Sequence, residues 1–100
     1  MAPEQARGRS REIDGRTDVW AVGATMFSLV SGRYVHDAET GSEAMAFAAT
    51  RPAPLLGDIA PGVAEGVRAV IDRALAYERE TRWESAGGMR DALVAVRRLG

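Results

Sequence analysis

The large apolar residues of this chain are most crowded in residues 18–32, the stretch DVWAVGATMFSLVSG. On a helical wheel they do not form one stripe but go most of the way round. A helix that is apolar on nearly all sides is either a core helix or a membrane span, and a span needs about 20 apolar residues. The pattern therefore predicts a buried core helix, which Thr17 or Asp18 can cap and which Gly32 can end in a left-handed turn.

Two more helices are predicted from apolar residues at helical spacing in the second half of the chain. In residues 62–77 the apolar side chains fall on one broad face, with charged residues on the other side. Ser85 is a good N-cap for the last helix, in which Met89, Leu93 and Val96 again follow a helical spacing.

Three other segments complete the expected architecture. Residues 2–7 fit one helical turn, and Ser42 is expected to cap a short, alanine-rich helix that runs through about Thr50. Residues 51–61 hold three of the four prolines, so an irregular connection is expected there. No segment alternates like a strand. The expected fold class is all-α, with about four helices around a central buried helix, joined by long polar loops.

Composition narrows the possible partners. A length of 100 residues predicts one small domain or part of a larger one. Thirteen basic and fourteen acidic side chains leave a net charge of −1, which gives no electrostatic reason to expect nucleic acid or an anionic membrane as partner. The absence of cysteine excludes disulfides and thiolate metal sites and fits a cytoplasmic protein. Residues 1–16 lack the apolar core of a secretory signal, and no membrane segment is expected.

Side chains suited to catalysis or metal binding are few. His36 is the single histidine, so a histidine-based metal cluster is not available, and we interpret it as a packing or surface group of its loop. Ser28 and Ser31 have no base nearby in the sequence, and the acidic residues are scattered. The residues by themselves therefore identify no nucleophile, metal site or cofactor site.

Four pieces of the sequence stand in an order that matches one known family. They are MAPEQ at residues 1–5, DGRTDVWAVG at 14–23, SGRYVH at 31–36 and RALAYERETRW at 73–83. Together they resemble the C-terminal part of the large lobe of a bacterial, eukaryotic-like serine/threonine protein kinase, in which an A-P-E motif closes the activation segment. The resemblance covers essentially the whole chain. Residues 1–100 are therefore expected to be a partial kinase domain, from the end of the activation segment through the last helices of the lobe.

The resemblance implies roles for four residues. Asp18 corresponds to an acid that, in the family, accepts backbone N–H groups of the catalytic loop; a helix-capping acid is the alternative, and both can hold. Glu4 corresponds to the A-P-E glutamate, whose partner is an arginine in the loop before the last helix. Arg82 is the best match for that arginine, and two unpaired surface charges are the alternative. Trp20 is expected to be a packing anchor. Residues 78–81 depart from the Asp-Pro that the family often has there.

The motifs that carry phosphoryl transfer are absent from this sequence. The reaction needs a glycine-rich loop, a lysine for the phosphates, Mg²⁺ ligands and an aspartate near the attacking hydroxyl. Here there is no G-x-G-x-x-G, no lysine, no H-R-D and no D-F-G. We therefore expect no catalytic, cofactor-binding or metal-binding residue in this chain, whereas ATP and Mg²⁺ are expected for the full-length parent. The economical hypothesis is a truncated reading frame or a fragment of a kinase.

Two classes of function remain open. In the first, the chain is the scaffold part of a serine/threonine kinase, and its protein partners are the missing kinase half or a protein substrate. In the second, it is a stand-alone helical protein-interaction module, or a pseudokinase remnant, without catalysis. Only three other helices are expected to cover a central helix that is apolar nearly all round, so part of its apolar surface would stay exposed. Self-association of the chain is therefore a further expectation. An upstream in-frame segment coding for H-R-D and D-F-G would favour the first class, and a monomeric, cooperatively folded chain the second.

Overall fold

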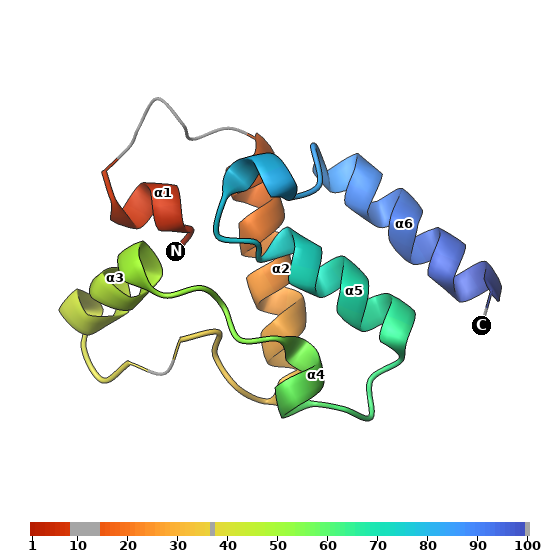
Figure 1. Ribbon diagram of the computed structural model, residues 1–100, viewed down its shortest axis with the longest axis horizontal. Helices are drawn as coiled ribbons and strands as arrows, with labels where there is room; N and C mark the ends of the chain where they lie inside the picture. Colours follow the sequence, from red (N-terminus) through yellow and green to blue (C-terminus); the bar gives the residue numbers. More distant parts are fainter. Residues whose placement is uncertain (9–14, 37, 100) are drawn as a thin grey trace.

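The computed structural model describes residues 1–8, 15–36 and 38–99, and Figure 1 shows their arrangement. Every regular element within these ranges is a helix. The elements are α1 (Pro3–Ala6), α2 (Gly15–Ser31), α3 (Gly41–Thr50), α4 (Leu56–Ile59), α5 (Glu65–Ala74), the 3₁₀ helix η2 (Arg79–Thr81) and α6 (Ala86–Leu99). The expected all-α class is confirmed. The single turns α1 and α4 add to the four longer helices.

The core lies where α5 and α6 pack against α2, which stands at the centre of Figure 1. Its buried residues form two clusters. The first consists of Ala2, Trp20, Phe27, Val35, Leu56, Ile71 and Leu75, and the second of Val19, Val70, Ala74 and Met89. The apolar face predicted for residues 62–77 is thus the face that meets α2, although α5 itself is shorter than that segment.

Another side of α2 is exposed along its length. Ala21, Val22, Thr25 and Leu29 lie on this side, which we call the open face of α2, and Leu29 is 79% exposed. The expectation of a buried central helix is therefore confirmed on the side of Val19, Trp20 and Phe27, but it does not hold for the open face. The reason is that α5 and α6 cover one side of α2, in a flat molecule with principal extents of 40 × 28 × 16 Å.

The ends of α2 follow the sequence in part. Gly32 has a φ of 71°, and its N–H donates to the carbonyl of Ser28 at 2.9 Å, so the predicted left-handed end is confirmed. At the other end α2 begins at Gly15, which places Thr17 and Asp18 inside the first turn. The prediction that Thr17 or Asp18 caps the helix is therefore wrong, because α2 begins before both of them.

The starts of the other helices depend on single side chains. Ser85 Oγ accepts the N–H of Gly88 at 3.0 Å, which confirms it as the cap of α6. Thr40, and not the expected Ser42, caps α3, because the extended backbone at Thr40 lets its hydroxyl accept the N–H of Glu43 at 3.1 Å. The segment predicted to be irregular contains α4, whose residue Leu56 donates its N–H to the Asp72 carboxylate at 2.9 Å.

A glycine sets how closely α2 approaches α5. A Cβ at Gly23 would stand 2.8 Å from Cβ of Ala74, closer than two carbon atoms can pack. Gly23 is also buried. The two helix backbones therefore meet at a separation that only glycine permits at this position.

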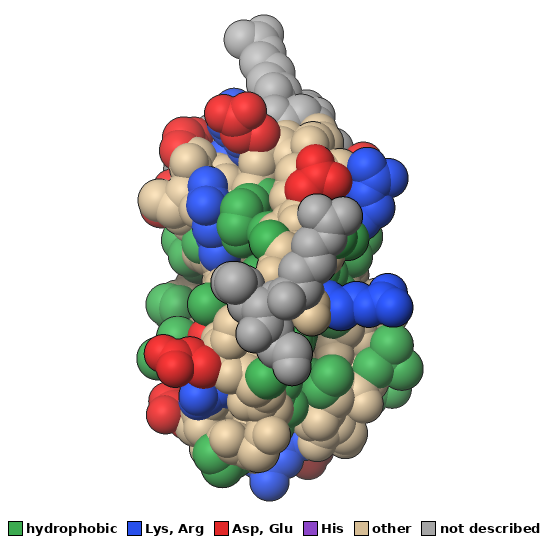
Figure 2. Space-filling view, turned by 90° about the vertical axis from the view of Figure 1, so that its right-hand side faces the viewer, with side chains coloured by type: hydrophobic (Ala, Val, Ile, Leu, Met, Phe, Trp, Pro, Cys, Tyr) green, Lys and Arg blue, Asp and Glu red, His purple; other side chains and the backbone are tan. Residues whose placement is uncertain are grey.

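On the face that Figure 2 shows, acidic and basic side chains lie among apolar ones, and no extended region carries a single charge. None of the described helices is long and apolar enough to cross a membrane. Among the described residues, no group of three or more acidic, histidine or cysteine side chains could hold a metal ion.

Candidate functional site

Glu4 is held by a short helix at the start of the chain. Pro3 occupies an early position of α1, where a missing N–H costs no hydrogen bond, and the Gln5 side chain accepts the N–H of Ala2 at 3.0 Å. These two features fix the single turn, and the turn directs Glu4 inward. Glu4 is 2% exposed.

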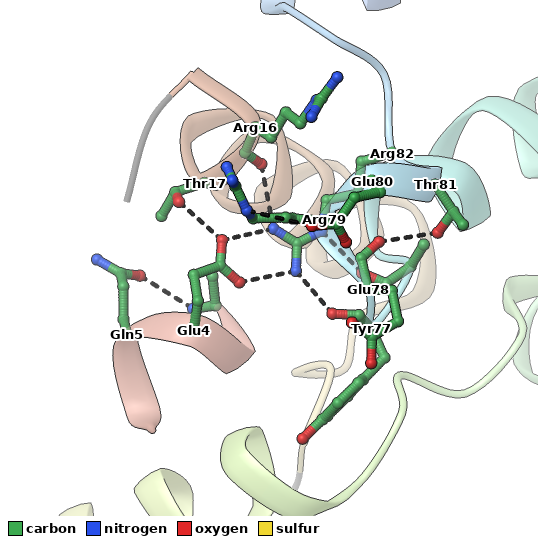
Figure 3. Close-up of polar contacts among 12 residues, drawn as sticks. Glu4, Gln5, Arg16, Thr17, Tyr77, Glu78, Arg79, Glu80, Thr81 and Arg82 are labelled. Atoms are coloured by element: carbon green, nitrogen blue, oxygen red, sulfur yellow. Dashed lines mark hydrogen bonds and ion pairs between the residues drawn. The ribbon is translucent and has the colours of Figure 1, made fainter. Parts of the chain in front are cut away.

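Arg82 meets Glu4 across 78 residues of sequence, as Figure 3 shows. It follows η2 directly, and it is 1% exposed. Its Nη1 lies 2.7 Å from Glu4 Oε2, and its Nη2 lies 2.9 Å from Glu4 Oε1. This is the bidentate geometry in which a planar guanidinium matches a carboxylate.

The remaining donors of Arg82 bind backbone carbonyls. Nε donates to Ala76 at 2.7 Å, Nη2 to Tyr77 at 3.1 Å, and Nη1 to Arg16 at 3.3 Å. A guanidinium has five N–H donors, and each of the five has an acceptor here. The charge is therefore buried without an unsatisfied donor, the condition under which a buried ion pair is tolerated.

Thr17 is the third side chain of the cluster, and its hydroxyl donates to Glu4 Oε2 at 2.7 Å. Burial would raise the pKa of the Glu4 carboxyl, but the hydrogen bonds from Arg82 and Thr17 outweigh it and lower this pKa from 4.5 to about 2. The cluster thus joins α1, the first turn of α2 and the loop before α6 through one ionised carboxylate. The sequence offered Thr17 as a helix cap, and no local signal pointed to this bond.

The other two residues singled out from the sequence lie elsewhere. Trp20 is 3% exposed and packs in the core with Phe27 and Ile71. Asp18 is exposed in the first turn of α2. The structure brings Glu4 and Arg82 together but not Asp18, and the contact with a catalytic loop that the resemblance implies for Asp18 remains a prediction.

One hollow of the described surface brings a serine hydroxyl and an imidazole into the same lining, where His36 Nε2 has no hydrogen-bond partner. A cavity of about 300 Å³ lies between α2 and the loop after it, with Trp20, Ser28 and His36 in its lining. The His36 ring packs edge-on against Phe47, with 6.4 Å between the ring centroids. This contact agrees with the interpretation of His36 as a packing group of its loop. The cluster of Glu4, Thr17 and Arg82, by contrast, holds α1, the first turn of α2 and the loop before α6 in place, and it offers no nucleophile.

Comparison with known proteins finds similarity over nearly the whole chain. The serine/threonine-protein kinase Pkn1 of Myxococcus xanthus is 37% identical over 93 residues, which are 93% of this chain and 13% of Pkn1. The serine/threonine-protein kinase PksC of Streptomyces coelicolor is 35% identical over 97 residues, 96% of this chain and 17% of PksC. The serine/threonine-protein kinase PknJ of Mycobacterium tuberculosis is 32% identical over 97 residues, 95% of this chain and 16% of PknJ.

No protein-family model matches the chain. The chain spans less than a fifth of the length of each of these relatives, 13 to 17%. The match nevertheless covers 93 to 96% of this chain. Over nearly its whole length, the chain is therefore similar to one segment of bacterial serine/threonine protein kinases, the C-terminal part of the large lobe.

Proposed function

We propose that residues 1–100 are a partial protein kinase domain that forms the helical base of the large lobe. The complete parent would transfer the γ-phosphate of ATP to serine or threonine hydroxyls of a protein. The buried, bidentate pair between Glu4 and Arg82 carries this proposal, because it fixes the segment that corresponds to the end of the activation segment. The similarity to serine/threonine kinases supports it.

In this proposal the chain supplies structure and not chemistry. Phosphoryl transfer depends on positioned phosphate donors, Mg²⁺ ligands and an aspartate beside the nucleophile, and this sequence has none of the motifs that carry them. ATP and Mg²⁺ would bind the parent outside these residues. The partners would be the rest of the kinase and its protein substrate, in the cytoplasm, which the absence of cysteine supports.

A chimera tests the scaffold role. The 93 residues of Pkn1 that match this chain are replaced by the corresponding residues of this chain, and transfer of labelled phosphate from ATP to protein is measured. We expect transfer to persist. Arg82→Leu in the chimera should abolish it, because the buried Glu4 carboxylate loses its partner.

Arg90→Leu is the matched control in the chimera, because the Arg90 side chain is 77% exposed. We expect it to leave transfer unchanged. A chimera that folds but transfers no phosphate would contradict the proposal, and so would equal activities of the Arg82 and Arg90 variants.

Titration of the isolated chain with Mg-ATP tests whether ATP and Mg²⁺ bind outside residues 1–100. We expect no saturable heat when Mg-ATP is titrated into the 100-residue chain, and no labelled phosphate transferred to protein. Saturable binding, or transfer that depends on this chain, would show that residues 1–100 contain a nucleotide site. It would also contradict the assignment of ATP and Mg²⁺ to the rest of the parent.

The alternative function is a stand-alone helical module that binds a protein partner without catalysis. The exposed apolar residues Val22 and Leu29 on the open face of α2 favour it, since they offer a surface that a partner could cover. A chain that is monomeric and unfolds cooperatively by itself would support this alternative over the partial kinase domain.

A further inference from the structure

The helix α3 is attached to the molecule outside its two core clusters. Neither core cluster contains a residue of α3, and Ala48 is the one residue of this helix that is buried. Among the helices of the described chain, α3 packs chiefly against the single turn α1, and Figure 1 shows the two side by side, away from α2, α5 and α6. The position of α3 therefore depends on contacts outside the core, among them α1 and the His36 ring on Phe47.

Tyr77 provides a further contact through its hydroxyl. The hydroxyl donates to the carbonyl of Ala49, in the last turn of α3. Carbonyls in the last turn of a helix have no partner within the helix, so this bond satisfies a group that the helix leaves free. The hydroxyl also accepts a hydrogen bond from Arg7 Nη1 at 3.2 Å, and the Arg7 guanidinium lies 5.2 Å from the centre of the Tyr77 ring.

The backbone of the same residue belongs to the buried cluster. Arg82 Nη2 donates to the carbonyl of Tyr77 at 3.1 Å while it also binds Glu4. Figure 3 shows the Tyr77 ring extending away from the ion pair. One residue therefore contacts Arg82 with its main chain and α3 with its side chain.

We propose that Tyr77 is a positioning residue that couples α3 to the buried pair of Glu4 and Arg82. Loss of its hydroxyl releases α3 locally while α2, α5 and α6 remain folded. Disturbance of Arg82 releases α1 and α3 together, because the Tyr77 backbone loses its anchor. This inference depends on the contacts of Tyr77 alone and holds whether or not the chain is part of a kinase.

Hydrogen exchange of backbone amides, followed by mass spectrometry, tests the coupling in the 100-residue chain. Tyr77→Phe removes the hydroxyl and keeps the ring. Because one hydrogen bond to a local structure is lost, we expect amides of α3 to exchange about fivefold faster, with exchange in α5 and α6 unchanged. Tyr34→Phe is the matched control, since Tyr34 is 79% exposed, and it should change none of these rates.

A second variant tests the backbone contact between Tyr77 and Arg82. Arg82→Lys retains the charge but cannot bind both Glu4 and the Tyr77 carbonyl in the same geometry, so exchange should speed up in α1 and α3 together. Unchanged exchange of α3 in Tyr77→Phe would overturn the proposal, as would an equal rise in α5 and α6. Faster exchange of α1 without α3 in Arg82→Lys would also overturn it.

Discussion

The contact of Glu4 with Arg82 is an ion pair whose two side chains are 2% and 0% exposed. Removal of two charges from water is costly, and their attraction offsets this cost only where further hydrogen bonds satisfy them. The three backbone carbonyls around Arg82 and the hydroxyl of Thr17 meet that condition. The pair therefore specifies which segments meet, and the loss of one partner is more damaging than the net worth of the pair.

A double-mutant cycle on this pair is the first prediction at this scale. Glu4→Ala and Arg82→Ala should each lower the free energy of unfolding by about 3–5 kcal/mol, because each leaves a buried charge without its partner. The double variant should lose clearly less than the sum. The free energy of unfolding is measured by urea unfolding of the 100-residue chain. If a variant of this chain does not fold, the same cycle is measured in the chimera with Pkn1.

The exposed pair of Arg90 and Asp91, with side chains 77% and 76% exposed, provides the control cycle. Its coupling should lie near the ~0–1 kcal/mol of surface pairs. Additive effects of Glu4→Ala and Arg82→Ala would contradict a shielded contact.

The low pKa of Glu4 predicts a loss of stability in acid. Because the pKa of about 2 in the folded chain lies below the ordinary value of 4.5, the carboxylate stabilises the folded state above pH 4.5. This stabilisation is lost as the pH falls toward 2, and with allowance for solvent screening it amounts to about 1–3 kcal/mol. Urea unfolding at a series of pH values should show a steeper acid decline for the unchanged chain than for Glu4→Gln.

Glu80→Gln is the control for this acid decline, since its side chain is 65% exposed. This variant should retain the decline of the unchanged chain. An unaltered decline in Glu4→Gln would show that Glu4 is not the titrating group.

At the scale of the elements, the packing of α2 on α5 depends on the missing side chain of Gly23. Ala74 cannot move aside as the end of a long side chain could, because its Cβ is fixed to the backbone of α5. An added methyl group must therefore push the two helices apart. The helix that carries the central core is thus packed to the limit on one side and open on another.

Gly23→Ala should lower the free energy of unfolding by about 1–3 kcal/mol, the usual cost of overpacking a core, although alanine is the better helix former. Gly41→Ala in α3 is the matched control, because nothing lies within 4 Å of a Cβ at that position. The free energies of unfolding of the two variants are compared by thermal or urea unfolding. A Gly23→Ala variant as stable as the Gly41→Ala variant would show that α2 and α5 do not meet this closely.

At the scale of the whole molecule, the open face of α2 makes the isolated chain prone to associate. Burial of a large apolar side chain contributes roughly 1.5–3 kcal/mol, and a small domain has about 5–15 kcal/mol in total. Leu29 is 79% exposed and Val22 is 42% exposed, so these side chains contribute only part of that burial free energy. The stability of the chain alone is therefore expected to be marginal, and contact between open faces would bury the exposed residues.

We expect the isolated chain to elute from size-exclusion chromatography at an apparent mass that rises with concentration, with a broad thermal transition. Leu29→Ser should reduce the association by removing the most exposed apolar group of α2. Leu55→Ser is the control, since Leu55 is 59% exposed but precedes α4. A sharp, concentration-independent transition of a monomer would contradict this prediction and would mean that the helices close their own core.

The sequence by itself determined the features that depend on neighbouring residues. The spacing of apolar residues located the main helices, and side-chain chemistry located the ends at Gly32 and Ser85. These features follow from φ preferences and from hydrogen bonds over a few residues. The A-P-E turn and the arginine before the last helix were identified through resemblance to a family, and the structure places Glu4 and Arg82 in contact.

The tertiary structure alone decided what meets across long stretches of chain. The Thr17 hydroxyl donates to Glu4 across 13 residues, and Tyr77 reaches Ala49 across 28 residues. A helical wheel shows that α2 is apolar nearly all round, but it cannot show which side α5 and α6 will cover. Helical periodicity reports the character of each face, whereas the partner of a face depends on how loops and close contacts such as Gly23 place the other helices.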